Sequence, residues 1–149
     1  VNVQGDEPEI PPACVERLIE LLDDSDAPMA TLLAPLPGDQ AHEPARVKCV
    51  ADLDGRALYF SRAPIPFDRD DEGGVAYRLH LGIYAYRAGF LRQFTELAPT
   101  PAEQAEKLEQ LRALEHGFDI LTAEVEYSGA GIDTPADYAA FVARMRTGG

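Results

Sequence analysis

The alternation of short apolar runs with proline-opened helical segments constrains this chain most strongly. Residues 1–4, 29–33 and 120–125 are β-prone runs that predict strands, and the run 29–33, bounded by Pro28 and Pro35, fits a buried parallel strand. Helices are predicted after Pro11 and Pro101, because proline fits the first helical position and apolar residues then recur at helical spacing. Strands that alternate with helices are typical of a mainly parallel sheet with helices on both faces. We therefore expect an α/β fold.

A second pattern predicts an antiparallel addition to this sheet. Residues 46–51 and 57–60 are β-prone and flank a turn that ends in Asp54-Gly55, which is a hairpin signal. Residues 80–86 indicate a further strand, which is followed by a short helix. The expected fold is accordingly a Rossmann-like sheet that carries this hairpin as an antiparallel extension.

Two capping boxes mark the starts of the later helices. Thr100-Pro101-Ala102-Glu103 predicts a helix that runs to Gly117, and Thr134-Pro135-Ala136-Asp137 predicts the last helix. We expect the last helix to bury its apolar residues, which are Tyr138, Phe141, Val142 and Met145. All of these elements fit one domain over residues 1–149.

The charge of the chain narrows its partners. Its 149 residues carry a formal net charge of −13 at pH 7, which repels polyanions and argues against a nucleic-acid-binding surface. No apolar run approaches the ~20 residues needed to cross a bilayer, and no secretory signal is recognisable, so we expect no membrane insertion and a cytoplasmic location. Cys14 and Cys49 lack metal-ligand spacing and are expected to be buried thiols.

Two aspartates are candidates for a catalytic metal site. Asp6 lies in the turn after the first predicted strand, where ligands bind in open α/β sheets, and Asp133 follows a glycine-rich loop just before the cap of the last helix. Two carboxylates with open water positions suit magnesium, which shares its oxygen shell with substrate phosphates. Both residues also fit turn carboxylates that bond their own backbone, so the residues alone leave the two interpretations open.

Other polar residues have a binding interpretation and a structural one. Arg62 follows the second hairpin strand and either presents its planar donors to a carboxylate or lies on the surface. His80 and Tyr84 share a strand face, so they line a site together or belong to an aromatic core. Glu109 and Gln110 flank the apolar stripe of the capped helix, where solvated side chains are usual.

Six ordered motifs are similar to those of the CMP-Kdo synthetase (3-deoxy-manno-octulosonate cytidylyltransferase) family. They are VNVQGDEPEIPP (1–12), MATL (29–32), ALYFSRAPIPFDRD (57–70), HLGIYAYRAGFLRQF (80–94), EKLEQLRALEHG (106–117) and GIDTPADY (131–138). The motifs span nearly the whole chain, and six in order are much harder to meet by chance than one. The resemblance implies the C-terminal portion of such an enzyme, with a nucleotidyltransferase sheet.

The resemblance assigns roles to the candidate residues. In this family the aspartates of QGDEP and of the G-[VI]-D-T-P motif bind magnesium, which implies Asp6 and Asp133 as catalytic metal ligands. The implied sugar-acid pocket is formed by Gln4, Arg62, His80, Tyr84, Glu109 and Gln110. The implied reaction transfers a cytidylyl group from CTP to Kdo, giving CMP-Kdo and pyrophosphate for lipopolysaccharide biosynthesis. A homodimer is also implied, with residues 46–94 carrying the sugar-binding and dimerisation hairpin region.

One departure from the family pattern is large. In this family a glycine-rich, basic strand-loop cradles the CTP phosphates, and residues 1–149 do not contain it. We therefore expect the N-terminal strands of the sheet to be missing and this polypeptide alone to be inactive. Two other hypotheses stay open, namely a cytidylyltransferase for 8-amino-Kdo or sialic acid, and a non-catalytic form that binds a sugar acid or dimerises.

Overall fold

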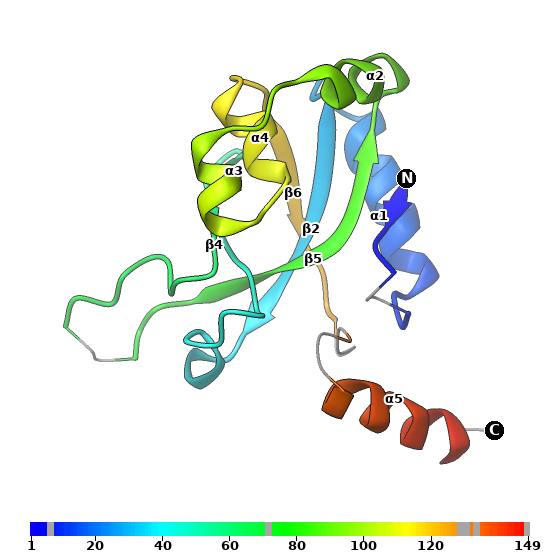
Figure 1. Ribbon diagram of the computed structural model, residues 1–149, viewed down its shortest axis with the longest axis vertical. Coiled ribbons are helices and arrows are strands. Elements are labelled where there is room, and N and C mark those ends of the chain that lie inside the picture. The colour runs from blue at the N-terminus through cyan, green and yellow to red at the C-terminus, as the bar shows by residue number, and fades with distance from the viewer. Residues whose placement is uncertain (6–7, 71–72, 128–131, 133–134, 148–149) are drawn as a thin grey trace.

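The computed structural model describes residues 1–5, 8–70, 73–127, 132 and 135–147 (Figure 1). Its elements in chain order are β1 (Asn2–Val3), α1 (Pro12–Asp23), β2 (Met29–Leu36), the 3-10 turn η1 (Gly38–Gln40), β3 (Lys48–Ala51), β4 (Ala57–Ser61), β5 (Tyr77–Tyr86), α2 (Ala88–Glu96), α3 (Pro101–Glu106), α4 (Gln110–Glu115), β6 (Ile120–Glu124) and α5 (Pro135–Thr147).

One six-stranded sheet organises the fold. Its strand order is β4-β3-β5-β2-β6, and β1 pairs with the edge of β5 that β3 also uses. Strands β2 and β6 are parallel, with Met29 opposite Ile120, whereas the other strand pairings in the described residues are antiparallel. The expected α/β class is confirmed. Its parallel character, which we expected to dominate, is confined among the described strands to the β2–β6 pair.

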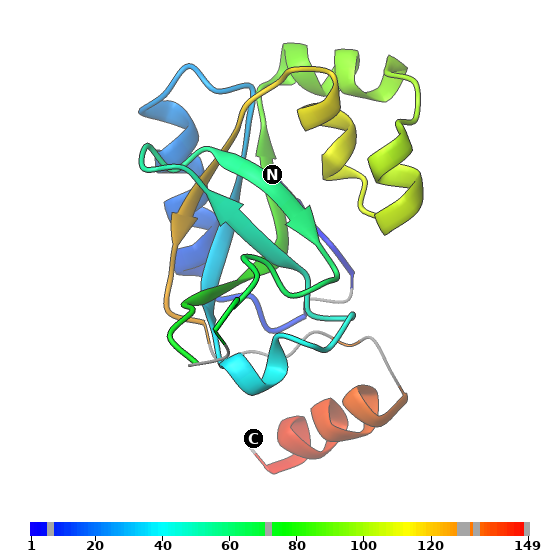
Figure 2. The same ribbon diagram turned by 90° about the vertical axis from the view of Figure 1, so that its left-hand side faces the viewer.

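Helices cover both faces of the sheet, as expected (Figures 1 and 2). On one face, side chains of helix α1 pack against those of β2 and β5. We call this group the α1 cluster; it consists of Cys14, Leu18, Leu22, Ala30, Leu32, Ala34, Leu81, Ile83 and Ala85. On the other face lies the α4 cluster, which consists of Met29, Leu33, Cys49, Ala57, Phe60, Tyr84, Phe90, Phe94, Leu108, Leu111, Ala113 and Ile120. Because strand side chains alternate, the neighbours Leu32 and Leu33 belong to different clusters. Cys14 and Cys49 are buried free thiols, one in each cluster, as predicted.

The predicted hairpin is present as β3 and β4, and its turn docks on the far edge strand. Asp52 Oδ1 accepts hydrogen bonds from the backbone amides of Asp54 (2.9 Å) and Arg56 (2.7 Å). Gly55 has a φ of +80°, and its carbonyl accepts from both the amide (2.7 Å) and the hydroxyl (2.8 Å) of Thr122 in β6. A Cβ at Gly55 would lie 3.1 Å from the Thr122 carbonyl oxygen, so the turn and this close approach both require glycine.

The helix expected from Pro101 to Gly117 is broken into α3 and α4. Its capping box is present, with the Thr100 amide donating to Glu103 Oε2 at 3.2 Å. The helix stops at Glu106, and Lys107 adopts a left-handed conformation with a φ of +56°. A tertiary contact explains the break, because the Glu106 carbonyl accepts a hydrogen bond from Arg62 Nε (2.8 Å).

Helix α5 stands apart from the sheet (Figures 1 and 2). The expectation that it buries Tyr138 and Met145 is wrong, since these side chains are 59% and 61% exposed. A salt bridge between Arg144 Nη2 and Glu9 Oε2 (2.5 Å) joins α5 to the segment before α1. None of the helices in the described residues, α5 included, is long and apolar enough to cross a membrane.

Candidate functional site

A bulge in β5 brings His80 and Tyr84 into contact. In a regular strand, residues four apart are separated by about 13 Å, but the ring centroids of His80 and Tyr84 lie 5.3 Å apart. The register gives the cause. Thr31 of β2 is opposite Tyr84 while Leu33 is opposite His80, so four residue steps of β5 run beside two steps of β2. The two rings therefore share one face of the sheet, as their spacing predicts.

His80 is a buried and neutral imidazole. The residue is 9% exposed, and its ring and that of Phe60 form a T-shaped pair with their centroids 5.0 Å apart. Its Nε2 lies 3.1 Å from the hydroxyl oxygen of Thr31. Burial lowers the pKa of His80 to about 3, so the ring carries no charge near pH 7. A neutral imidazole offers one donor and one acceptor, which suits a ligand hydroxyl better than a carboxylate.

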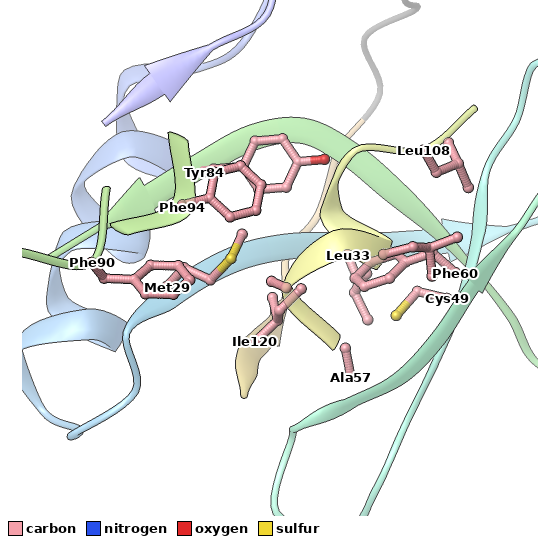
Figure 3. Packing of buried hydrophobic residues seen from close by; sticks show 12 residues of the cluster. Met29, Leu33, Cys49, Ala57, Phe60, Tyr84, Phe90, Phe94, Leu108 and Ile120 are labelled. Atoms are coloured by element: carbon pink, nitrogen blue, oxygen red, sulfur yellow. The ribbon is translucent and has the colours of Figure 1, made fainter. Parts of the chain in front are cut away.

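Aromatic side chains continue from His80 along this face. The ring centroids of Tyr84 and Tyr86 lie 6.0 Å apart, and those of Tyr86 and Phe94 lie 5.9 Å apart. In Figure 3 the Tyr84 hydroxyl points away from Phe90 and Met29. Burial and then the charge of Glu109 raise the pKa of Tyr86 to about 12. Glu109, at the start of α4, is therefore electrostatically coupled to the aromatic face.

The start of α4 presents one exposed and one buried polar side chain. Glu109 is exposed and lies 3.4 Å from Arg112 Nη2. Gln110 is only 5% exposed, so it is not a solvated helix residue, and its Nε2 has no hydrogen-bond partner within the described residues. An amide donor buried without an acceptor costs about 1–3 kcal/mol. Because Nε2 is sealed from solvent, an acceptor oxygen that recovers this cost reaches it only when a neighbouring side chain moves.

Arg62 is held at the base of the hairpin. Its Nε donates to the Glu106 carbonyl (2.8 Å) and its Nη1 to the Pro44 carbonyl (2.9 Å). The Glu106 carboxylate in turn accepts from Ser61 Oγ (2.6 Å) and from the Arg62 amide (3.0 Å). Two of the five guanidinium donors thus bond backbone oxygens, and a ligand carboxylate would have to use the others. This placement is neither the free surface arginine nor a guanidinium devoted to a ligand.

Sequence reasoning missed a buried lysine beside Arg62. Lys48 of β3 is fully buried, and its Nζ donates to the carbonyls of Arg62 (2.6 Å) and Glu43 (3.1 Å). Burial lowers the pKa of Lys48, and the charge of Glu106 acts in the opposite direction. The pattern of the 46–51 strand gave no signal for this role, because lysine side chains are rarely buried.

Gln4 lies at the same face as Tyr84. Its amide donates to the Gly82 carbonyl of β5 (2.9 Å), and its side chain is exposed. Asn2 is paired with Tyr84 in the antiparallel ladder, and residues two apart in a strand share a face. Gln4, which directly follows β1, therefore lies on the sheet face that His80 and Tyr84 of β5 share.

The two predicted metal ligands, Asp6 and Asp133, lie outside the described residues. Their convergence stays a prediction. Within the part of the chain that the structure describes, no group of three or more His, Cys, Asp or Glu side chains is arranged to hold a metal ion. A pair of carboxylates is nevertheless the donor type that magnesium takes together with water and phosphate oxygens.

Comparison with known proteins decides the family. A cytidylyltransferase family model matches residues 1–120, which include β5 and the start of α4. The chain belongs to the cytidylyltransferase family. A cytidylyltransferase named 3-deoxy-manno-octulosonate cytidylyltransferase, from Halorhodospira halophila, is 51% identical over 99% of this chain and 62% of the relative. The protein of the same name from Myxococcus xanthus is 48% identical over 100% of this chain and 61% of the relative.

A solved cytidylyltransferase structure has the same fold. It is a CMP:2-keto-3-deoxy-manno-octonic acid synthetase complexed with CTP, and it matches with a TM-score of 0.90 and 45% identity. The match covers 98% of this chain and 61% of that one. The expected resemblance to CMP-Kdo synthetases is confirmed. The chain spans about three fifths of the length of the cytidylyltransferases it matches.

Proposed function

We propose that this chain is the sugar-acid-binding part of a CMP-Kdo synthetase, which transfers the cytidylyl group of CTP to Kdo. The observation that carries the proposal is the buried Gln110 donor, which has no acceptor within the described residues and stands next to Glu109. A sugar hydroxyl is the kind of neutral acceptor that such a donor requires. The names of the relatives support Kdo as the sugar acid.

Each polar residue of this face has a distinct part in the proposal. Gln110 donates to a sugar hydroxyl, and the Glu109 carboxylate accepts from one. His80 and Tyr84 form the aromatic wall, and Gln4 adds an amide at its edge. The donors of Arg62 that do not bond Glu106 or Pro44 face the sugar carboxylate.

The proposed reaction is a phosphoryl transfer. The anomeric hydroxyl oxygen of Kdo bonds to the α-phosphorus of CTP, the bond from that phosphorus to pyrophosphate breaks, and the hydroxyl proton is lost. The residues of this chain hold the sugar oxygen in line with the phosphorus and restrict water, which is most of what such a reaction asks of a protein. Magnesium bound by Asp6 and Asp133 would supply charge neutralisation at the phosphate and a lower pKa for the sugar hydroxyl.

We also propose that the protein acts in the cytoplasm as a homodimer that uses residues 46–94, and that its product serves lipopolysaccharide biosynthesis. Leu58 and Phe67 lie in this region and are 61% and 82% exposed. A subunit interface typically covers large apolar side chains that are exposed to solvent on the single subunit. These exposures support a shared surface on the hairpin side of the sheet.

The test measures pyrophosphate release from CTP and Kdo by the protein that contains this chain, in the presence of magnesium. Asp6→Asn and Asp133→Asn should each lower kcat more than ~100-fold, by analogy with the removal of one preorganised electrostatic group. A neutral amide cannot hold magnesium as well as a carboxylate does, and both variants are expected to keep the native fold. Circular dichroism checks that both variants remain folded.

Asp39→Asn provides the matched control, because Asp39 is an exposed aspartate on η1. This variant should have a normal kcat. Near-normal turnover in Asp6→Asn or Asp133→Asn would remove that residue from the site. Turnover with sialic acid or 8-amino-Kdo in place of Kdo would contradict the proposed sugar.

A further inference from the structure

Thr31 occupies the position opposite the β5 bulge. It is fully buried in β2, and its hydroxyl oxygen lies close to three polar groups of β5. These are the carbonyl oxygen of Ile83 at 2.8 Å, the carbonyl oxygen of Leu81 at 3.3 Å and Nε2 of His80 at 3.1 Å. The hydroxyl therefore connects the irregular part of the strand with the buried imidazole.

The single proton of this hydroxyl determines the direction of the network. Both carbonyl oxygens accept only, so the hydroxyl donates to them, with the shorter contact at Ile83. If the hydroxyl donated to His80 instead, its oxygen would face two carbonyl oxygens at 2.8 and 3.3 Å with no proton between them. The arrangement free of this repulsion has the His80 Nε2–H donating to Thr31 Oγ1.

The other nitrogen of His80 then carries a lone pair. Burial lowers the pKa of His80 to about 3, so the ring is neutral near pH 7 and holds one proton. Nδ1 makes no hydrogen bond with any described residue. The fully buried side-chain atoms without a partner among these residues belong to Thr100 and Gln110, not to His80. Nδ1 is thus an acceptor that no described residue uses.

We propose that Thr31 is a positioning residue that fixes His80 as the Nε2–H tautomer, so that Nδ1 accepts a hydrogen bond from a hydroxyl of the sugar acid. The ligand part of this inference rests on the proposed function. The consequence is a site that selects a hydrogen-bond donor at one sugar position. A sugar analogue with a hydrogen or an ether oxygen there leaves Nδ1 unpaired and binds more weakly.

The first test needs no substrate. Nitrogen-15 NMR of the histidine side chains distinguishes the two neutral tautomers, and the native protein should show His80 protonated at Nε2. Thr31→Ser keeps the hydroxyl and should keep this tautomer. Thr31→Val keeps the shape but removes the acceptor, so the Nδ1–H form should gain population. A native His80 protonated at Nδ1, or an unchanged tautomer in a folded Thr31→Val variant, would overturn the proposal.

The second test uses substrate saturation. Thr31→Val should raise the KM for Kdo about 3- to 10-fold with little change in the KM for CTP, since one neutral hydrogen bond to the sugar is weakened. Thr31→Ser should stay close to the native value, which a loss of packing alone would not explain. An equal rise in both KM values would overturn the assignment. If no sugar acid is turned over by the native protein, the proposed function fails, and the NMR comparison still decides whether Thr31 sets the tautomer.

Discussion

His80 is a base that folding removes from water, and this couples stability to pH. Its pKa is about 3 in the folded chain and 6.5 without burial, so below pH 6.5 the unfolded chain binds a proton that the folded chain does not. The stability that depends on neutral His80 is complete above pH 6.5 and is lost as the pH falls towards 3.

The pH dependence of unfolding should therefore change when His80 is replaced. Between pH 6 and 4, the native free energy of unfolding should fall by about 1.4 kcal/mol per pH unit more than that of His80→Gln. Urea unfolding at several pH values measures both slopes. His42→Gln removes an exposed histidine and serves as the control. Equal slopes in the native protein and in His80→Gln would show that the buried imidazole is not the source.

Single residues differ in how far the sequence could reveal them. The shared face of His80 and Tyr84 follows from strand spacing. The contact between their rings does not, because it depends on a two-residue difference in register between β2 and β5. Thr31 was missed for the same reason. Lys48 was missed because its acceptors, the carbonyls of Glu43 and Arg62, come from loops whose paths the sequence does not specify.

At the scale of elements, Glu106 joins the end of α3 to the end of β4. Its carboxylate holds Ser61 and Arg62, and its carbonyl holds the Arg62 guanidinium. The connection from α3 to α4, which leads to Glu109 and Gln110, is thereby held against Arg62. A change at Glu106 should loosen this connection without removing apolar contacts.

Glu106→Gln should lower the free energy of unfolding by about 1–3 kcal/mol. The amide oxygen can still accept from the Arg62 amide and the NH2 group can donate to the Ser61 hydroxyl oxygen, but both hydrogen bonds become neutral and lose the strength that the carboxylate charge gives them. Urea unfolding at neutral pH provides the measurement. Glu96→Gln is the control, because Glu96 is an exposed glutamate at the end of α2. A loss no larger than that of the control would show that the carboxylate does not secure the connection.

Element types were more predictable than element limits. The Asp-Gly turn and the capping box of α3 are local signals, and both are present where the sequence places them. The break at Lys107 is not a local property, because the apolar stripe runs through it. The helix ends there through the bond from Arg62, which is 44 residues away in the chain.

For the molecule as a whole, the α/β class followed from the alternation of elements, but strand direction did not. A strand has the same side-chain pattern in either direction, so the antiparallel position of β5 between β2 and β3 could not be derived from periodicity. The exposure of Tyr138 and Met145 has a similar cause. Helical spacing shows which side chains can pack together, and the tertiary arrangement decides whether a surface covers them.

The sharing of β2 and β5 between the two clusters has a kinetic consequence. Leu32 and Leu33 are adjacent in the chain but pack on opposite faces, so neither face can open while the other keeps both strands ordered. Backbone amides of β2 and β5 should therefore exchange with deuterium at one common, slowest rate that reports opening of the whole sheet, while those of α5 exchange sooner. Mass spectrometry of exchanged peptides measures these rates, and faster exchange in β2 than in α1 would contradict a single cooperative unit. A destabilising change on one face should then accelerate exchange beneath the helices of the other.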